Sequence, residues 1–537
     1  MNRRANAFAI ICVLAFLAMG WSLLPYPGLE ADEVLFACPL YAPYAWTGRI
    51  RMFHTDLPTM VMNYIGTLKT SLYAVIFHSF NPTDITVRLP MLLLTAVTIW
   101  IVYRLLLRTA GVRAALAACI ILATDPVFLM TALFDWGPVA IQHFLIAAAM
   151  LLLVIFHQRA SYPALAAAAF TLGLGLWDKV SFAWLLVALI LAGAITFNRE
   201  IRTHFAPKPL AIAFIAFVAG ALPLLIFNYQ HHAATLHVGA GINSTEFEGK
   251  YESFRDVLRG SGLYGYLSAE DPTQPGRQPG TAIERLSVAV HNAIGHSAGN
   301  LGAIAFILAA ALAMIRWRSS RALRFSLLFV LVAWLSMLLV KGAGGSVHHT
   351  ILLWPGVPML IGFAIAEISN HAGKRAQWTA ISLSAALVAG NILIYNEYLY
   401  SFVRYGSRAA WSSAINPLAD SLLTQHPTRV CLADWGMINQ LRILGHGTLA
   451  IDDVSFTLLS FTGSPSDNDS LRQCAADSVI VTHTPPLEEF KGARQRLDRW
   501  ASAHGFEPTP IATITDELDR PVFVTFRYTP HATAKIQ

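Results

Sequence analysis

Eleven apolar runs, separated by short polar segments, constrain what this chain can fold into. Most are close to the roughly 20 residues that a helix needs to cross a bilayer. The chain has 537 residues, of which 55% are apolar and 13% charged, far from the composition of a water-soluble domain. We therefore predict an α-helical polytopic membrane protein. The predicted spans lie near residues 6–24, 86–104, 113–131, 138–156, 164–177, 180–197, 209–227, 299–315, 323–340, 350–367 and 377–395.

Lysine and arginine gather in alternate loops between these runs, which is how cytoplasmic loops are recognised. The basic clusters lie at residues 3–4, 104–113, 199–208, 316–324 and 374–375. This bias predicts a multi-pass plasma (inner) membrane protein whose N-terminus is cytoplasmic and whose residues after 396 are extracytoplasmic. Membrane topology explains the net charge of +6, so nucleic-acid binding is not expected.

Residues 59–80 are apolar enough to span the membrane, but Lys69 stands at their midpoint. A charge at the bilayer centre is costly, so we predict that this stretch lies along the outer surface as a juxtamembrane hairpin. It belongs to a long first outer loop, residues 25–85, with juxtamembrane helices. A second outer loop, residues 228–298, contains the Pro/Gly-rich stretch 271–280, whose mobility would suit a lid.

The sequence divides into a membrane domain, residues 1–395, and an extracytoplasmic α/β domain, residues 396–537. In the second domain, short β-branched runs alternate with helical ones. Strands are expected near 429–433, 448–451, 478–482 and 521–528, and helices near 412–426 and 487–504. The five cysteines have no metal-site spacing, and only Cys431 and Cys474 share this region, where export would permit one disulfide.

Acidic residues follow two of the predicted spans. Glu30, Asp32 and Glu33 come soon after the first span, and Asp135 comes just after the third. A solvated loop and an interfacial cap would account for them. The alternative is catalytic, because a carboxylate near an acceptor hydroxyl can remove its proton. Under the predicted topology both segments face the same side, which favours a shared cleft.

Other charged residues near the spans have two interpretations. Asp125 precedes Pro126 inside the third span, where we favour a structural role at a proline kink over a functional intramembrane carboxylate. Asp178 and Lys179 are adjacent near a span boundary, as a structural pair or a substrate contact. Arg88 is interpreted as snorkelling at the start of its span.

Basic groups on the predicted outer side could stabilise a phosphate leaving group. Lys69, Lys341, His348 and His349 belong to this set. The glycine-rich stretch 341–349 is either an exposed turn with polar helix caps or a phosphate cradle of backbone N–H groups, lysine and histidine.

Together these features resemble the GT-C superfamily of polytopic glycosyltransferases. Within it, the chain is similar to the family 39-like group, which includes protein O-mannosyltransferases and lipid A aminoarabinose transferases. The resemblance covers most of residues 1–365 and rests on the order of its motifs. These are Asp32-Glu33 after the first span, Tyr64–Lys69, Val87–Pro90, Asp135, Gly173–Lys179 and His348–Pro355.

The resemblance implies an inverting enzyme that moves a sugar from a polyprenyl-phosphate donor to a glycolipid, polysaccharide or protein acceptor. It implies that Asp32 is the general base, beside Glu33, and that Asp135 assists. Lys69 and Lys179 would contact the lipid phosphate, with Lys341, His348 and His349 as further phosphate-binding residues. No metal cofactor is expected, although some relatives use a divalent ion.

A transporter or flippase of lipid-linked glycans is the alternative function. Transporters tend to hold their binding groups near the bilayer midplane. Here the charged residues gather at the predicted outer rim, and Asp125 is almost the only carboxylate inside a span. An enzyme is therefore favoured.

Overall fold

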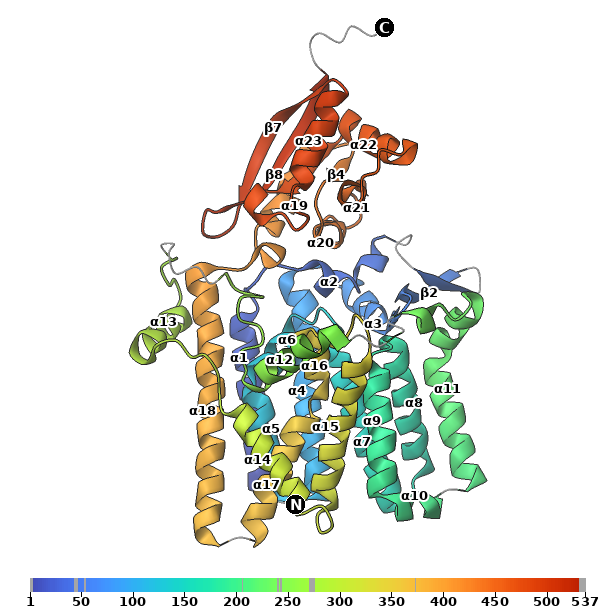
Figure 1. The fold of residues 1–537 in the computed structure, drawn as a ribbon, viewed down its shortest axis with the longest axis vertical. Helices are drawn as coiled ribbons and strands as arrows, with labels where there is room; N and C mark the ends of the chain where they lie inside the picture. The colour runs from blue at the N-terminus through green and yellow to red at the C-terminus, as the bar shows by residue number, and fades with distance from the viewer. Residues whose placement is uncertain are drawn as a thin grey trace.

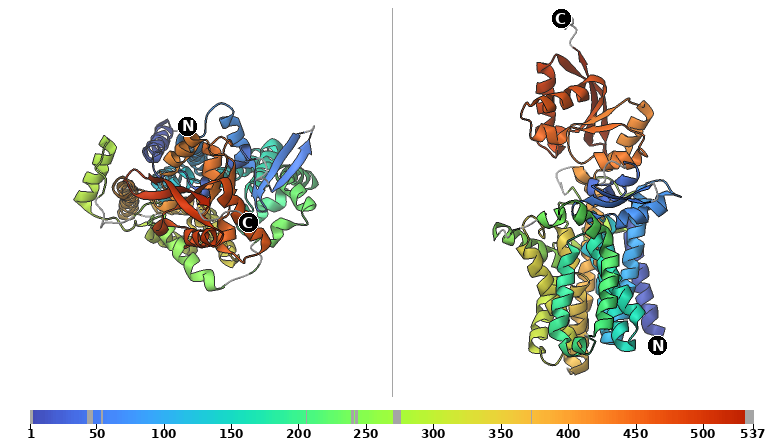
Figure 2. Two further views of the ribbon diagram at one scale, coloured as in Figure 1. Left: turned by 90° about the horizontal axis from the view of Figure 1, so that it is seen from above. Right: turned by 90° about the vertical axis from the view of Figure 1, so that its right-hand side faces the viewer.

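The structure is a computed structural model that describes residues 3–42, 47–52, 55–204, 206–238, 241, 244–269, 276–371 and 373–530. A bundle of long helices forms one domain, and a smaller mixed domain stands on one end of it (Figure 1). We call that end of the bundle the domain-facing end. The loop between the first two long helices lies between the two domains, as the side view in Figure 2 shows.

Helices form at all eleven predicted spans. They are α1 (Arg3–Leu23), α4 (Asp84–Thr109), α5 (Val112–Thr124) with α6 (Pro126–Leu133), α7 (Val139–Arg159), α8 (Tyr162–Asp178), α9 (Phe182–Thr196), α11 (Pro207–Gln230), α14 (Gly302–Ile315), α15 (Arg321–Leu339), α16 (Val347–Thr350) with α17 (Gly356–His371), and α18 (Lys374–Tyr405). Shorter helices of this domain are α2 (Ala31–Val34), η1 (Cys38–Leu40), α3 (Leu68–Phe77), α10 (Asn198–His204), η3 (Ala234–His237), η4 (Ser244–Glu246), α12 (Phe247–Leu258), α13 (Ala282–Ile294) and η5 (Ile351–Leu353).

The helices support a multi-pass membrane protein. Within the described ranges, seven helices are long and apolar enough to cross a membrane, and the bent pair α5–α6 makes eight. Helices α8, α9 and α14 are shorter, with 17, 15 and 14 residues. The predicted fold class is confirmed, whereas the number of eleven crossings stays a prediction. Helix α18 continues to Tyr405, beyond the predicted domain boundary at residue 395.

Asp125 closes a break in the third predicted span. Helices α5 and α6 meet there at 61°, and Pro126 begins α6 because a first helical residue needs no N–H. The Asp125 carboxylate accepts hydrogen bonds from the backbone N–H of Phe128 at 2.9 Å and from the indole N–H of Trp354 at 3.0 Å. Asp125 therefore caps α6 and ties it to the segment before α17, which fits the structural interpretation.

Residues 59–80 do not form a spanning helix. They contribute to an antiparallel sheet of order β1-β2-β3, built from β1 (Gly48–Met52), β2 (Thr55–Met62) and β3 (Ile65–Gly66), and then to the short helix α3. The sheet and α3 lie at the domain-facing end (Figure 1). The prediction that this stretch does not cross the bundle agrees with the structure, although a strand pair replaces part of the expected hairpin.

The C-terminal domain is built around a five-stranded sheet of order β5-β4-β6-β8-β7, in which β4 runs parallel to β5 and β6. Strands β8 and β7 run antiparallel to their neighbours. Its elements are η6 (Ala409–Trp411), α19 (Ile415–Gln425), β4 (Val430–Leu432), α20 (Ile438–Leu444), β5 (Ile451–Asp453), α21 (Ser455–Leu459), α22 (Pro465–Asp477), β6 (Val479–His483), η7 (Pro485–Leu487), α23 (Ala493–Ala503), β7 (Phe506–Thr515) and β8 (Pro521–Pro530). All four expected strands are present.

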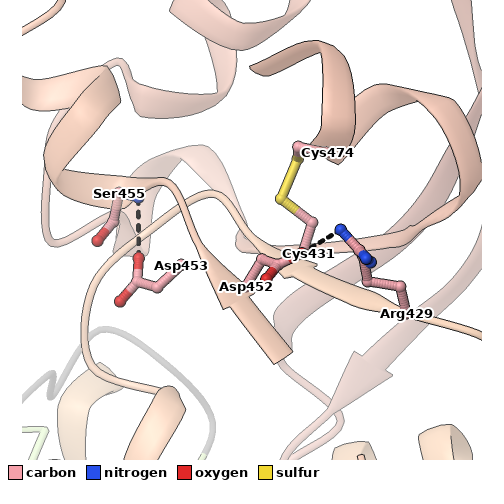
Figure 3. The surroundings of a disulfide bond; sticks show 6 residues. All are labelled: Arg429, Cys431, Asp452, Asp453, Ser455 and Cys474. Carbon is pink, nitrogen blue, oxygen red and sulfur yellow. Dashed lines mark hydrogen bonds and ion pairs between the residues drawn. A yellow bond between two sulfur atoms is a disulfide. The ribbon is translucent and has the colours of Figure 1, made fainter. Parts of the chain in front are cut away.

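Cys431 and Cys474 form the disulfide that the sequence left open. It joins β4 to α22, and the two Cα atoms are 5.5 Å apart (Figure 3). Beside it, Arg429 forms an ion pair with Asp452 at 3.0 Å. The bond therefore links the sheet to a covering helix within the C-terminal domain.

Direct hydrogen bonds seat the C-terminal domain on the loop that follows α1. The Gly28 N–H donates to the carbonyl of Trp411 at 2.8 Å, and the Asn439 side chain of α20 donates to the carbonyl of Ala31 at 3.1 Å. Gly28 is needed at this close approach, because a Cβ there would lie 2.2 Å from the Ser412 carbonyl oxygen. The residues around Asp32 are thus held between the two domains.

Candidate active site

The short helix α2 fixes the position of Asp32. Glu30 is its N-cap, and the Glu30 carboxylate accepts hydrogen bonds from the backbone N–H groups of Asp32 at 2.7 Å and Glu33 at 3.1 Å. This capping box is the usual way to begin a helix. In return the Glu33 carboxylate accepts the backbone N–H of Glu30 at 3.3 Å, and Glu33 is buried while Asp32 is half-buried. The three carboxylates therefore lie close together, and burial followed by the charge of Asp32 raises the pKa of Glu30.

Glu33 is held by Arg88. The Arg88 guanidinium lies 2.7 and 2.9 Å from the two Glu33 carboxylate oxygens, and both side chains are buried. Its remaining N–H groups donate to the carbonyls of Leu24, Pro27 and Gly28 at 3.1, 2.7 and 2.9 Å. The interpretation of Arg88 as a snorkelling residue is wrong, because the side chain is enclosed and organises the whole loop.

The Asp32 carboxylate has fewer hydrogen-bond partners than the Glu33 carboxylate. Among the described residues, no group donates a hydrogen bond to its carboxylate, although its backbone is tied to Glu30. Burial raises the pKa of Asp32, and the charge of Lys179 opposes part of that rise. A carboxylate with a raised pKa and open oxygens is a better proton acceptor than an ordinary surface aspartate.

Lys69 and Asp135 form a buried ion pair. The Lys69 ammonium lies 2.9 Å from an Asp135 carboxylate oxygen, and it donates to the Asp135 carbonyl at 2.6 Å. The side chains are 0% and 1% exposed. The ammonium also lies 4.3 Å from the centre of the Phe36 ring, within cation–π range. These two predicted site residues are brought together, and each is engaged by the other.

Lys179 lies near Asp32 because α8 ends there. Its backbone pairs with Ile65, which fixes the α8–α9 junction against the first loop. Burial lowers the pKa of Lys179 to about 8, against the raising effect of the Asp32, Asp178 and Asp135 charges. Asp178, the last residue of α8, is buried beside this group. Charged residues from four segments therefore converge at the domain-facing end.

The two histidines of α16 are held in one orientation. The indole N–H of Trp136 donates to Nδ1 of His348 at 2.8 Å, and the backbone N–H of Gly344 donates to Nδ1 of His349 at 3.2 Å. A nitrogen that accepts an N–H bond carries no proton, so in each neutral ring the proton is on Nε2. A Cβ on Gly137 would lie 2.5 Å from the His348 ring, so only glycine leaves room for it.

Lys341 is exposed, and the backbone of the glycine turn that follows it contacts the carboxylate of Glu246. The Gly342 N–H donates to both Glu246 carboxylate oxygens at 3.2 and 3.0 Å, and Lys250 pairs with Glu246 at 3.2 Å. Within the described part of the chain, no side-chain contact joins Lys341 to Lys69, Lys179 or the histidines. The structure thus brings His348 and His349 toward the other predicted residues and leaves Lys341 at the rim.

No group of three or more His, Cys, Asp or Glu side chains within the described ranges is arranged to hold a metal ion.

Three residues near Asp32 escaped the sequence analysis as site residues. Burial raises the pKa of Tyr64 and of Tyr266, and the charge of Asp32 adds to the rise in both, after that of Glu30 for Tyr266, while Trp136 orients His348. For Trp136, its place directly after the candidate catalytic Asp135 is the local signal for a more specific role.

Residues 60–227 match the family model described as dolichyl-phosphate-mannose-protein mannosyltransferase. This segment runs from β2 through α11 and contains Lys69, Arg88, Asp135 and Lys179. No curated protein sequence matches the chain.

Solved structures share the fold. ArnT from Cupriavidus metallidurans, bound to undecaprenyl phosphate, is 13% identical, with 97% of each chain covered and a TM-score of 0.54. The Archaeoglobus fulgidus oligosaccharyltransferase, in complex with zinc and sulfate, is 10% identical, with 98% of this chain and 73% of that chain covered and a TM-score of 0.56. Arabinofuranosyltransferase AftD from Mycobacteria is 18% identical, with 99% of this chain but only 40% of that chain covered and a TM-score of 0.52. The predicted resemblance to GT-C superfamily glycosyltransferases is confirmed.

Proposed function

We propose, from the premise that this chain has the fold of the GT-C glycosyltransferases, that it transfers a sugar from a polyprenyl-phosphate donor to an acceptor hydroxyl at the outer face of a membrane. Asp32 is the general base. The observation that carries this proposal is the half-buried Asp32 carboxylate, which receives no hydrogen bond from the described residues and lies near the cationic Lys179.

The reaction is one displacement. Asp32 takes the proton from the acceptor hydroxyl while the acceptor oxygen forms a bond to the anomeric carbon. The bond from that carbon to the phosphate oxygen breaks, and the electron pair leaves with the polyprenyl phosphate. Because the acceptor attacks opposite the leaving group, the configuration at the anomeric carbon inverts. No covalent sugar-enzyme intermediate forms.

The phosphate is received by Lys179 and by the Nε2–H groups of His348 and His349. Fixed donors of this kind stabilise charge where it develops. The enclosed pair of Lys69 and Asp135 gives Lys69 a supporting role, in which it orients Asp135 and the start of α7. The Asp135 carboxylate also accepts the Ala140 N–H at 3.2 Å. Glu33 supports the loop through Arg88 and leaves proton transfer to Asp32.

Two likenesses support a lipid phosphate donor. The matched family model carries the name of a dolichyl-phosphate-mannose enzyme, and the ArnT structure holds undecaprenyl phosphate. The acceptor on this proposal is a glycolipid, polysaccharide or protein. The C-terminal domain then lies outside the cytoplasm and the N-terminus inside, in a bacterial-type inner membrane.

The test is Asp32→Asn in the full-length protein, reconstituted with polyprenyl-phosphate sugars extracted from membranes. Release of free polyprenyl phosphate is measured by mass spectrometry. Losing a general base lowers the rate by about 10²–10⁴-fold. Asp420→Asn changes an exposed carboxylate on α19 in the same way and keeps wild-type activity.

Wild-type release by Asp32→Asn, with intact thermal unfolding, rejects Asp32 as the base. A flippase would move the donor lipid without forming free polyprenyl phosphate, so the same assay separates the two functions.

A further inference from the structure

Tyr266 is an exposed aromatic residue held in a fixed loop. Its side chain is 44% exposed. The loop around it is paired to the segment after α18, since Arg408 N–H donates to the Leu267 carbonyl at 3.1 Å and Ala269 N–H donates to the Gly406 carbonyl at 2.9 Å. The chain directly after Tyr266 is therefore anchored, and this exposed tyrosine is held in place.

Two tryptophans lie behind Tyr266. The ring centres of Tyr266 and Trp136 are 5.5 Å apart, those of Tyr266 and Trp411 are 6.1 Å apart, and those of Trp136 and Trp411 are 5.5 Å apart. Both tryptophans are buried. These spacings are within the range of direct ring contact, so the three residues form one rigid aromatic cluster with Tyr266 as its open face.

The open face is next to the proposed base. The carbonyl of Trp411 accepts the N–H of Gly28, two residues before Glu30, at 2.8 Å. The partial burial of Tyr266 raises its pKa, and the negative charges of Glu30 and Asp32 raise it further, with a smaller contribution from Glu489. Trp136 follows Asp135 directly, so the backing of the cluster belongs to the same segment as the proposed active site. A ligand on Tyr266 would therefore lie beside Asp32.

Glu489 comes to this place from the C-terminal domain. Its side chain is exposed. Its backbone N–H donates to the buried Asp434 carboxylate at 3.0 Å, and the next N–H, of Phe490, donates to the same carboxylate at 2.9 Å. The loop that carries Glu489 is thus anchored on Asp434, in the domain that also supplies Trp411.

We propose that Tyr266, backed by Trp136 and Trp411, is the stacking surface of an acceptor subsite for a carbohydrate ring, with Glu489 accepting its hydroxyl groups. The C–H face of a sugar carries partial positive charge and packs on the negative face of an aromatic ring. Carboxylates accept hydrogen bonds from hydroxyls strongly. The role in transfer rests on the proposed function, whereas binding itself does not.

Neutral trisaccharides of mannose, glucose, arabinose and N-acetylglucosamine test this subsite, with the full-length protein in lipid nanodiscs. Tryptophan fluorescence reports binding, because Trp136 and Trp411 lie directly behind the surface. At least one trisaccharide is expected to give a saturable change. Loss of stacking in Tyr266→Ala weakens it by about two- to tenfold, whereas Tyr266→Phe retains it. Glu489→Gln weakens it by a smaller factor.

Tyr251→Ala is the matched control, because Tyr251 is a 55% exposed tyrosine on α12, outside the cluster. Binding unaffected by Tyr266→Ala overturns the proposal, as does a panel in which no trisaccharide binds. Competition by tetramethylammonium would assign the surface to a cation, and competition by a Ser/Thr peptide would assign it to a protein acceptor. Each of these results also rejects the carbohydrate subsite.

Two further arms separate this proposal from the proposed function. Nanodiscs loaded with extracted polyprenyl-phosphate sugars retain trisaccharide binding if the surface serves the acceptor, and lose it if the donor sugar occupies Tyr266. Asp32→Asn retains trisaccharide binding when Asp32 is only the base. Full transfer activity in Asp32→Asn, together with Tyr266-dependent binding, would reject the base and keep the subsite.

Discussion

Asp434 in the C-terminal domain and Asp32 in the membrane domain are both shielded from water, but they are satisfied differently. Asp434 accepts a hydrogen bond from His483 at 2.7 Å and three more from backbone N–H groups at 2.9 to 3.0 Å. Burial alone would raise the pKa of Asp434, yet His483 and those N–H groups lower it. The pKa of Asp32 is raised. One carboxylate is used to hold a loop, and the other is available to a substrate.

Arg88→Met is expected to cause the largest loss of stability, because it removes the partner that stabilises the acids around Asp32. Glu33 would become a buried charge without compensation, which costs about 3–5 kcal/mol. The measurement is thermal unfolding of the purified full-length protein. The double variant Arg88→Met/Glu33→Leu removes both charges and is expected to recover part of the loss. Wild-type unfolding of Arg88→Met would show that Arg88 does not support the loop.

Asp434→Asn tests the other side of the comparison. The amide still accepts some of the four hydrogen bonds, so the expected loss of stability is about 1–3 kcal/mol. The loop that carries Glu489 loosens, and the acceptor KM rises while kcat at saturating acceptor stays near wild type. Asp420→Asn is the control with no buried partner. A fall in kcat comparable to that of Asp32→Asn would contradict a purely supporting role.

The sequence predicted the membrane domain well because its signals are additive along the chain. Apolar runs predicted each long helix, and the central Lys69 separated residues 59–80 from the spans. Strand β7 was missed because Pro508 and Pro510 argue against a strand. It is nevertheless tolerated at the edge of the sheet, where one side of the strand needs no partner.

Pairings between distant residues could not be read from the sequence. Glu33 and Arg88 are 55 residues apart, and Lys69 and Asp135 are 66 apart. Nothing local distinguishes a charge that meets a partner from one that meets water. The same limit explains why Tyr266 was overlooked, because its proposed role depends on contacts with Trp136 and Trp411, which come from two other segments.

The pH dependence of transfer tests the protonation states of Asp32 and Lys179 directly. Asp32 must be ionised to accept a proton, and its raised pKa moves the acid limb above the range of an ordinary aspartate. Lys179 must stay protonated to meet the phosphate, and its pKa of about 8 gives an alkaline limb. At one pH unit above that value, kcat/KM is expected to be about tenfold lower.

Lys179→Arg checks the assignment of the alkaline limb. A guanidinium stays charged at every relevant pH, so this limb moves upward while the acid limb remains. The measurement is kcat/KM for donor cleavage between about pH 4 and about pH 10, a range that covers both limbs. An unchanged alkaline limb in Lys179→Arg would assign that limb to another group.

Trp136→Phe probes the smallest part of the site, one hydrogen bond that orients a ring. Phenylalanine keeps the aromatic contact with Tyr266 and removes the N–H that Trp136 donates to His348. The His348 ring can then exchange its tautomer, and a phosphate donor at Nε2 is no longer fixed. Losing one neutral hydrogen bond costs about 0.5–1.5 kcal/mol, equivalent to a donor KM about two- to tenfold higher. Trp500→Phe loses the matched indole bond to Asn468 in the C-terminal domain and leaves the donor KM unchanged.

Because trisaccharide binding depends on the ring and donor binding on the N–H, Trp136→Phe separates the two roles of Trp136. Equal weakening of both would mean that Trp136 acts only through packing.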